Sequence, residues 1–254
     1  DPVRNFATLR TGLRSASNGI ISLEIADNGT FTVTDLRSQR AYPGQNDYRI
    51  DREIGDGWGH CSPVGASCTV GGHCRNISIV HDGPERVEFE IVREFELARE
   101  LVFAGGVNTN YEGVRESHET ISFVIRTRVA LDRGSDAISV STQIDNNLRD
   151  ARLQLVIPTG IAGSYRAGQA FCINERVPGR MLGTETETFA EAESPDKNFN
   201  GLVGKQDEQG GLYFLGNAGI HECGSLSEAE DVLTVTFFRT FCRTVERNGE
   251  DECE

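Results

Sequence analysis

The sequence predicts an all-β protein built as one large antiparallel β-sandwich. The main evidence lies between residues 119 and 158, where apolar residues recur at every second position: Ile121, Phe123, Ile125, Val129 and Leu131. The same alternation resumes at 138–144 and 153–157, and a helical period is nearly absent. Side chains on a strand alternate between two faces, so each segment has one apolar and one polar face. An apolar face needs a second layer to cover it, which predicts two packed sheets.

The first predicted element is a hairpin over residues 21–33. Apolar residues alternate on both sides of the turn sequence Asp27-Asn28-Gly29, whose glycine suits a tight connection. Residues 36–75 are rich in Gly and Asp and predict an irregular segment.

Further strands are predicted at 87–97, 211–215 and 232–241, and a polar loop at 178–200. No linker or internal repeat divides the chain, so we expect a single domain of about ten to fourteen strands, with 1–17 and 243–254 peripheral.

Composition excludes several classes of function. The net charge of −14 disfavours nucleic acid as a partner, because neutralisation of phosphates supplies most of that affinity. No apolar run reaches the roughly 18 residues of a membrane span, and the first 14 residues have no apolar core typical of a signal peptide. Seven cysteines is an odd count, which favours free thiols and a cytoplasmic location.

Five potential metal ligands gather in one short segment: His60, Cys61, Cys68, His73 and Cys74. Thiolate and imidazole are good zinc ligands, but no Cys-x-x-Cys pair is present and the spacing matches no recognised zinc finger. The alternatives are free thiols or, in an exported protein, a Cys68–Cys74 disulfide. We therefore expect neither a metal site nor a cofactor in this chain.

Four segments, in order, resemble the C-terminal β-sandwich region of glycoside hydrolase family 38, the α-mannosidase family. They are the hairpin Asn18 to Asp35; the loop Glu53-Ile54-Gly55-Asp56-Gly57-Trp58-Gly59-His60; Ile144-Asp145-Asn146 with Asp150, Arg152, Leu153 and Pro158; and Gly211-Leu212 with Gly216 to Glu222, Leu233-Thr234 and Phe238-Arg239.

The resemblance implies a supersandwich of the galactose-mutarotase-like type. It also implies a non-catalytic part of a longer retaining glycosidase, with zinc and the nucleophilic Asp in a separate catalytic domain. The carbohydrate substrate and that catalytic domain are then the expected partners, while a membrane is not. We assign no catalytic residue to this chain, because no pair of carboxylates can be placed from spacing.

The loop with Asp56, Trp58 and His60 is the candidate for contact with substrate. In related mannosidases the matching aromatic loop approaches the catalytic pocket, and Trp58 stands where many of them carry Tyr. An aromatic face stacks on sugar C–H groups, and a carboxylate accepts hydrogen bonds from hydroxyls. The alternative is structural: Trp58 caps the core, and Asp56 closes a glycine turn.

Two other functions remain open. His118, flanked by Glu116 and Glu119, is a possible acid/base pair of a mutarotase-type sugar epimerase, because imidazole titrates near neutrality; a solvated histidine at the start of a strand is the alternative. A carbohydrate-binding module is also possible, although one Trp and five Tyr supply few platforms for sugars.

The turn near residue 150 is expected to be structural. Asp145, Asn146 and Asp150 suit hydrogen bonds to nearby backbone, and Arg152 is expected to pair with Asp150 or Asp145. Glu222 is either a carboxylate that fixes a turn or a residue at the edge of a pocket.

Overall fold

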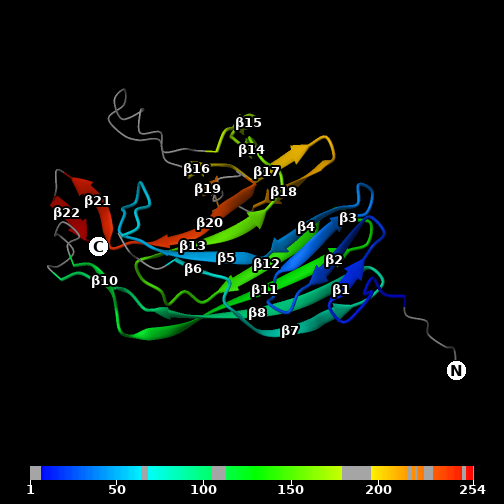
Figure 1. Cartoon of the computed structure of the whole chain (residues 1–254), viewed down its shortest axis with the longest axis horizontal. Coiled ribbons are helices and arrows are strands. Elements are labelled where there is room, and N and C mark those ends of the chain that lie inside the picture. The colour runs from blue at the N-terminus through cyan, green and yellow to red at the C-terminus, as the bar shows by residue number, and fades with distance from the viewer. Residues whose placement is uncertain are drawn as a thin grey trace. The chain divides into compact units, whose positions relative to one another are not determined.

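A computed structural model describes residues 7–63, 68–104, 113–178, 196–216, 219–220, 222–225, 231–247 and 250–253. These residues form strands, turns and loops, and no helix occurs among them, so none is present that could cross a membrane (Figure 1). The chain divides into two compact units, each assembled from three segments. Unit 1 comprises Asp1–Asn46, Gly71–Leu97 and Thr120–Asn147; unit 2 comprises Asp47–Val70, Ala98–Glu119 and Leu148–Glu254.

Unit 1 begins with a four-stranded sheet in the order β1-β2-β3-β4. Its strands are β1 (Ser15–Ser17), β2 (Ile21–Ile25), β3 (Phe31–Asp35) and β4 (Arg40–Gln45). β2 and β3 pair antiparallel with Ile25 opposite Phe31, which confirms the predicted hairpin. Gly29 in its turn has a φ of 81°, a conformation that residues with a side chain rarely adopt.

The second sheet of unit 1 has the order β12-β11-β8-β7. Its strands are β12 (Ile138–Ile144), β11 (Thr120–Asp132), β8 (Arg86–Ala98) and β7 (His73–Asp82). The alternation predicted for β11 is confirmed, because Phe123, Ile125, Val129 and Leu131 are fully buried. In β12, an edge strand, Val140 is half exposed, so the buried apolar face predicted for 138–144 is wrong there.

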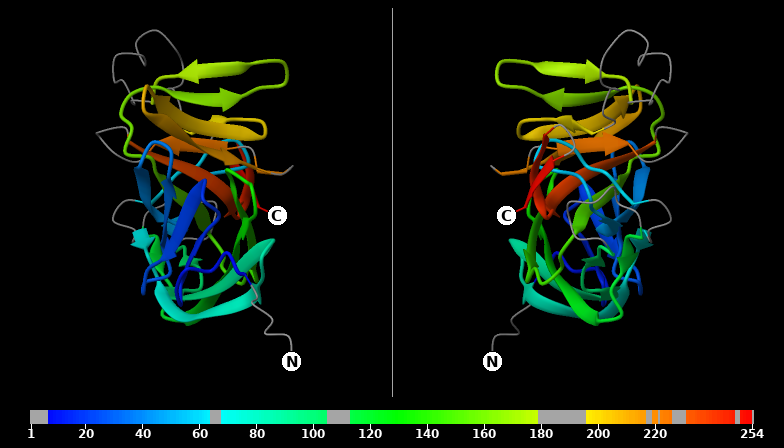
Figure 2. Two further views of the ribbon diagram at one scale, coloured as in Figure 1. Left: turned by 90° about the vertical axis from the view of Figure 1, so that its right-hand side faces the viewer. Right: turned by 90° about the vertical axis from the view of Figure 1, so that its left-hand side faces the viewer.

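One hydrophobic core joins the two sheets of unit 1. It contains Leu23, Ile25 and Phe31 from the first sheet and Phe89 and Val129 from the second. Figure 2 shows the blue strands of the first sheet beside the cyan and green strands of the second. The alternation of apolar residues thus drives burial of the inner faces within this unit.

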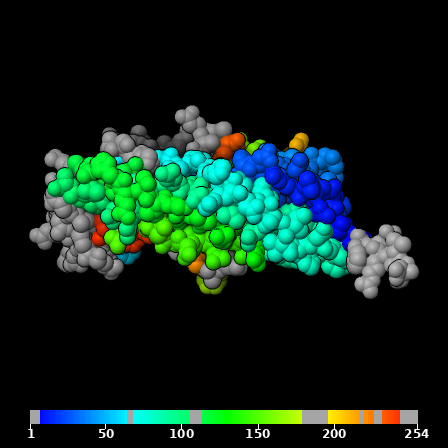
Figure 3. Space-filling view, turned by 90° about the horizontal axis from the view of Figure 1, so that it is seen from below, coloured from blue at the N-terminus to red at the C-terminus, as the bar shows by residue number. Residues whose placement is uncertain are grey.

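The outer face of β7, β8 and β11 carries charged residues. In Figure 3, which is coloured by residue number, these strands form part of the cyan and green surface. Arg75 pairs with Glu94, and Arg128 lies 3.3 Å from Glu90. Such exposed cross-strand ion pairs each contribute at most about 1 kcal/mol, so they keep this face soluble more than they stabilise it.

Unit 2 is built around a six-stranded sheet in the order β16-β19-β20-β13-β5-β6. Its strands are β5 (Asp47–Arg52), β6 (Cys68–Val70), β13 (Ala151–Pro158), β16 (Lys197–Asn198), β19 (Glu222–Ser225) and β20 (Val232–Thr240). β13 pairs with β5 on one side and β20 on the other. This central position places side chains from three distant parts of the sequence next to one another.

Unit 2 also contains a four-stranded sheet in the order β15-β14-β17-β18. Its strands are β14 (Tyr165–Gly168), β15 (Ile173–Arg176), β17 (Leu202–Asp207) and β18 (Gly210–Leu215). Tyr165 and Val203 of this sheet pack with Ile157, Leu233 and Val235 of the six-stranded sheet. β18 and β20 confirm the strands predicted at 211–215 and 232–241. Two short pairs remain: β9 (Leu101–Val102) with β10 (Arg115–Glu116), and β21 (Arg243–Arg247) with β22 (Glu250–Cys253).

The predicted single large β-sandwich of the supersandwich, galactose-mutarotase-like type is wrong. Among the described residues, twenty-two strands form six small sheets of two to six strands each, spread over two units. Alternation reports the two faces of a strand but not its neighbours: β11 and β13, both from the run at 119–158, lie in different sheets. Residues 36–75, predicted to be irregular, contain β4, β5 and β6.

The proposed single domain with peripheral ends stays a prediction, and most of the predicted loop at 178–200 lies outside the described residues.

Candidate functional site

The predicted contact residues lie on a loop of unit 2 that follows β5 and is described up to Pro63. Trp58 is 84% exposed, so the alternative that it caps the core is wrong. The Asp56 carboxylate accepts hydrogen bonds from the backbone N–H groups of Trp58 (2.8 Å) and Gly59 (3.1 Å). Asp56 therefore closes the turn that presents Trp58, as the structural alternative predicted.

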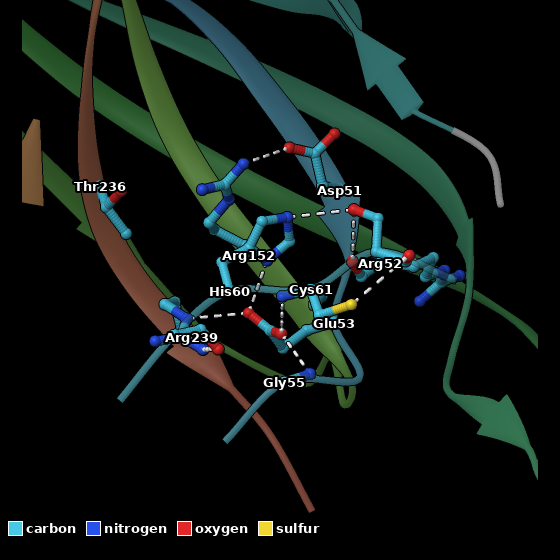
Figure 4. A network of polar contacts seen from close by, with 12 residues as sticks. Asp51, Arg52, Glu53, Gly55, His60, Cys61, Arg152, Thr236 and Arg239 are labelled. Atoms are coloured by element: carbon cyan, nitrogen blue, oxygen red, sulfur yellow. Dashed lines mark hydrogen bonds and ion pairs between the residues drawn. The ribbon is translucent and has the colours of Figure 1, made fainter. Parts of the chain in front are cut away.

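A buried carboxylate that the sequence did not single out, Glu53, anchors this loop (Figure 4). Its Oε1 accepts from the backbone N–H of Gly55 (2.7 Å) and of Cys61 (3.1 Å). Its Oε2 lies 2.7 Å from His60 Nδ1 and 2.8 Å from Arg239 Nε. Both ends of the loop and one residue of β20 thus converge on one side chain.

Arg239 ties the tip of the loop to the sheet. Its second terminal nitrogen donates to the carbonyls of Asp56 (2.7 Å) and Gly59 (2.6 Å). A planar guanidinium with several fixed donors suits this task better than a single ammonium. Because Arg239 is nearly buried, the loop is fixed at its base while Trp58 projects into solvent.

Glu53 stays ionised in this setting. Burial raises its pKa, but hydrogen bonds and charge from His60 and Arg239 outweigh burial, and the net pKa lies below its ordinary value. A carboxylate only accepts hydrogen bonds, so all four of its partners donate.

His60 connects the buried carboxylate to an exposed hydroxyl. Its Nε2 lies 3.0 Å from Ser62 Oγ, and that hydroxyl also lies 3.2 Å from the Arg52 carbonyl. The imidazole is largely buried whereas Ser62 is exposed. His60 is therefore oriented on both sides.

A second network of buried charges lies beside the first on the same sheet. Arg152 of β13 donates to Asp51 of β5 (3.0 Å) and to Asp196 (2.6 Å), and Arg49 lies 2.9 Å from Asp51. The predicted pairing of Arg152 with Asp150 or Asp145 is therefore wrong. Asp150 instead accepts from the backbone N–H of Leu101 (3.0 Å).

The potential metal ligands are divided between the two units. His60, Cys61 and Cys68 belong to unit 2, and His73 and Cys74 to unit 1. Within the described part of the chain, no three His, Cys, Asp or Glu residues are grouped so as to hold a metal ion. Cys68 and Cys74 are free, so the alternative Cys68–Cys74 disulfide is not formed.

The other candidate carboxylates each contact a cation or a hydroxyl. Glu116 accepts from Arg52 (2.8 Å), Glu119 pairs with Arg99 (2.8 Å), and His118 is exposed. Glu222 accepts from the Thr236 hydroxyl at 2.6 Å. His221, which the fourth motif contains, lies outside the described residues.

Sequence reasoning missed Glu53, Ser62 and Arg239 as members of this site. Glu53 and Arg239 stand inside two of the motifs quoted above, but 186 positions separate them. Only the pairing of β5 and β20 with β13 brings them together. The available signal was a charged residue in each of the two motifs, Glu53 at the start of the glycine-rich loop and Arg239 within the strand predicted at 232–241.

Gly55→Ala should distort the loop and destabilise the protein by about 1–3 kcal/mol in urea unfolding. An added Cβ would lie 2.0 Å from the Gly59 carbonyl and 2.7 Å from Glu53 Oε1. Gly59→Ala is the matched control, because nothing lies within 4 Å of its added Cβ. Equal losses in the two variants would contradict this account of the loop.

Comparisons with known proteins match only at the level of structure. No protein-family model matches the sequence, and no curated protein matches it. The structure of an α-mannosidase from Enterococcus faecalis V583 is similar, with a TM-score of 0.83 and 18% identity over 93% of this chain and 27% of that chain. A glycosyl hydrolase family 38 protein from Enterococcus faecalis matches with a TM-score of 0.81 and 17% identity, over 93% of this chain and 28% of that one.

The chain thus spans about a quarter of the length of these solved structures. The resemblance predicted from the four motifs is confirmed at this level: the chain has the fold of a segment of glycoside hydrolase family 38 proteins.

Proposed function

We propose that this chain is a non-catalytic β portion of an α-mannosidase-like retaining glycoside hydrolase, where it supports the catalytic domain and extends the loop 53–62 toward the sugar. The proposal is supported by the fold shared with family 38 proteins and by the four motifs in order. This chain covers about a quarter of the length of those proteins. Their activity, substrate and partners are therefore assigned to it here only as a proposal.

The observation that carries the proposal is the exposure of Trp58 on an anchored loop. Because the Trp58 side chain is 84% exposed, it contributes little hydrophobic free energy to the folding of this unit. Glu53 and Arg239 nevertheless fix the backbone beneath it. A rigid, solvated indole can stack on a sugar with little loss of conformational entropy. Asp56 and His60 remain proposed contacts, and both are already hydrogen-bonded within the loop.

Trp58→Ala in the full-length enzyme should lower kcat/KM for a mannoside about tenfold, equivalent to about 1.4 kcal/mol of lost contact with the sugar. Phe171→Ala is the matched control, because Phe171 is also an exposed aromatic of unit 2. Its kcat/KM should equal that of the parent. If Trp58→Ala also leaves kcat/KM unchanged, the proposed contact does not exist.

The proposal has three further parts. The partner of this chain is the catalytic domain of the same polypeptide, that domain binds zinc, and the protein is cytoplasmic. In this proposal zinc belongs to the rest of the enzyme, so metal analysis should find stoichiometric zinc in the full-length protein and none in this chain alone. Zinc bound to this chain alone would contradict that division.

A further inference from the structure

Ser62, His60 and Glu53 form a continuous hydrogen-bonded relay from solvent to a buried charge. Ser62 Oγ lies 3.0 Å from His60 Nε2, and His60 Nδ1 lies 2.7 Å from Glu53 Oε2. Exposure falls along the relay, because Ser62 is exposed, the His60 side chain is 14% exposed and that of Glu53 is 0% exposed. This is the order of nucleophile, base and orienting carboxylate in acyl-transfer enzymes of unrelated folds.

The charge of Glu53 sets the tautomer of His60. Since the ionised carboxylate only accepts hydrogen bonds, Nδ1 carries the proton that faces Glu53. In the neutral imidazole Nε2 is then an acceptor directed at Ser62. The Ser62 hydroxyl has one proton and two acceptors within reach, and His60 Nε2 is nearer than the Arg52 carbonyl.

The carboxylate is itself held in place, as such a relay requires. Arg239 Nε and the backbone N–H groups of Gly55 and Cys61 occupy the other acceptor positions of Glu53. Rotation of the carboxylate would break these bonds in a site from which water is excluded. Glu53 and Arg239 are therefore positioning residues for His60.

We propose that Ser62 is a nucleophile activated by His60, and that it accepts the acyl group of a carboxylic ester. The favoured substrate is an O-acyl ester of a carbohydrate, because Ser62 shares its loop with exposed Trp58. Only that choice of substrate rests on the proposed function.

The reaction balances without a cofactor. Ser62 Oγ bonds to the ester carbonyl carbon while its proton moves to His60 Nε2. The tetrahedral intermediate expels the alcohol, which takes the proton back from Nε2 as the C–O bond breaks. Water then attacks the acyl-serine with His60 as base, which releases the carboxylic acid and restores Ser62.

The residue after the nucleophile limits the rate. Pro63 has no N–H, so it cannot stabilise the oxyanion, and the loss of one such donor costs about 10²–10³-fold in rate. The proposal therefore predicts that both acylation of Ser62 and turnover of p-nitrophenyl acetate are slow.

A fluorophosphonate probe tests the proposal on the full-length protein, with the modified residue located by peptide mass mapping. Ser62 should carry the label, at a rate that depends on the imidazole 3.0 Å from its hydroxyl. His60→Gln should slow labelling about 100-fold or more, and Ser62→Ala should abolish labelling. Cys61→Ala, the neighbouring exposed nucleophile, should label at the parental rate and controls for thiol reactivity.

The outcomes separate the two proposals. Labelling that persists in Ser62→Ala, or that is equal in the parent and His60→Gln, overturns the nucleophile whatever Trp58→Ala does to mannoside cleavage. If Ser62 is labelled, release of acetate from an acetylated mannoside should exceed that from p-nitrophenyl acetate and fall in Trp58→Ala. An equal rate in Trp58→Ala overturns the carbohydrate as substrate.

Discussion

Arg152→Met is expected to destabilise the protein by about 3–5 kcal/mol, because removal of one partner leaves buried charges without compensation. Arg152 is 4% exposed and joins Asp51 and Asp196, whose side chains are 3% and 15% exposed. Methionine keeps most of the volume of the side chain, so the loss reports charge more than packing. Urea unfolding near neutral pH measures the effect.

The control for Arg152 is an arginine in an exposed ion pair. Arg128 lies 3.3 Å from Glu90 on the outer face of unit 1 and is 55% exposed. Arg128→Met should cost at most about 1 kcal/mol, since water screens such pairs. If Arg152→Met lowers the free energy of unfolding by no more than Arg128→Met does, the buried network contributes no more stability than an exposed ion pair.

Asp51 explains why this network is sensitive to acid as well. Burial raises the pKa of Asp51. The hydrogen bonds from Cys68 and Arg152 and the charges of Arg49 and Arg152 lower it by more, so the net pKa lies below its ordinary value of 3.8. The network is thus intact above that range and is lost as pH falls through the folded-state pKa.

Glu53→Gln is the second substitution with a large expected effect, a loss of about 3–5 kcal/mol at neutral pH. The amide cannot carry the charge that faces Arg239, and its NH₂ group would meet donors where the carboxylate had accepted. The protein has a single tryptophan, on this loop, so the anisotropy of its fluorescence reports loop order directly. Anisotropy should fall in the variant.

The pH dependence of this variant has a definite sign. The pKa of Glu53 is depressed below its ordinary 4.5, so its ionised form contributes stability above that value. The difference between parent and Glu53→Gln should shrink as pH falls through the folded-state pKa. Glu119→Gln, at an exposed ion pair with a 59% exposed side chain, should cost at most about 1 kcal/mol at any pH. A difference for Glu53→Gln that grows toward acid would refute the assignment.

The sequence predicted local features well and distant pairings poorly. The hairpin at 21–33 and the strand at 121–131 were found because hydrophobic alternation is a local signal. The partner of Arg152 was misassigned because Asp51 lies 101 positions away and meets it only through the pairing of β5 with β13. Glu53 and Arg239 were missed for the same reason, because 186 positions separate them in the sequence.

Trp58 shows the same limit at the site. Its residue type and glycine-rich neighbours indicated a loop with a chemical role, but not whether the indole was buried. Exposure depends on Arg239, which draws the carbonyls of Asp56 and Gly59 toward the sheet. No pattern within the loop itself carries that information.

Each unit is assembled from three stretches that alternate along the sequence, and this bears on how the protein can be dissected. A single truncation point cannot free either unit: a gene shortened after Asn147 would encode all of unit 1 but strip unit 2 of β13, its middle strand. Isolated units would instead require rejoined termini and redesigned connections. Deletions from either end of this polypeptide should therefore leave at least one unit incomplete, whereas point substitutions leave the chain of both units complete.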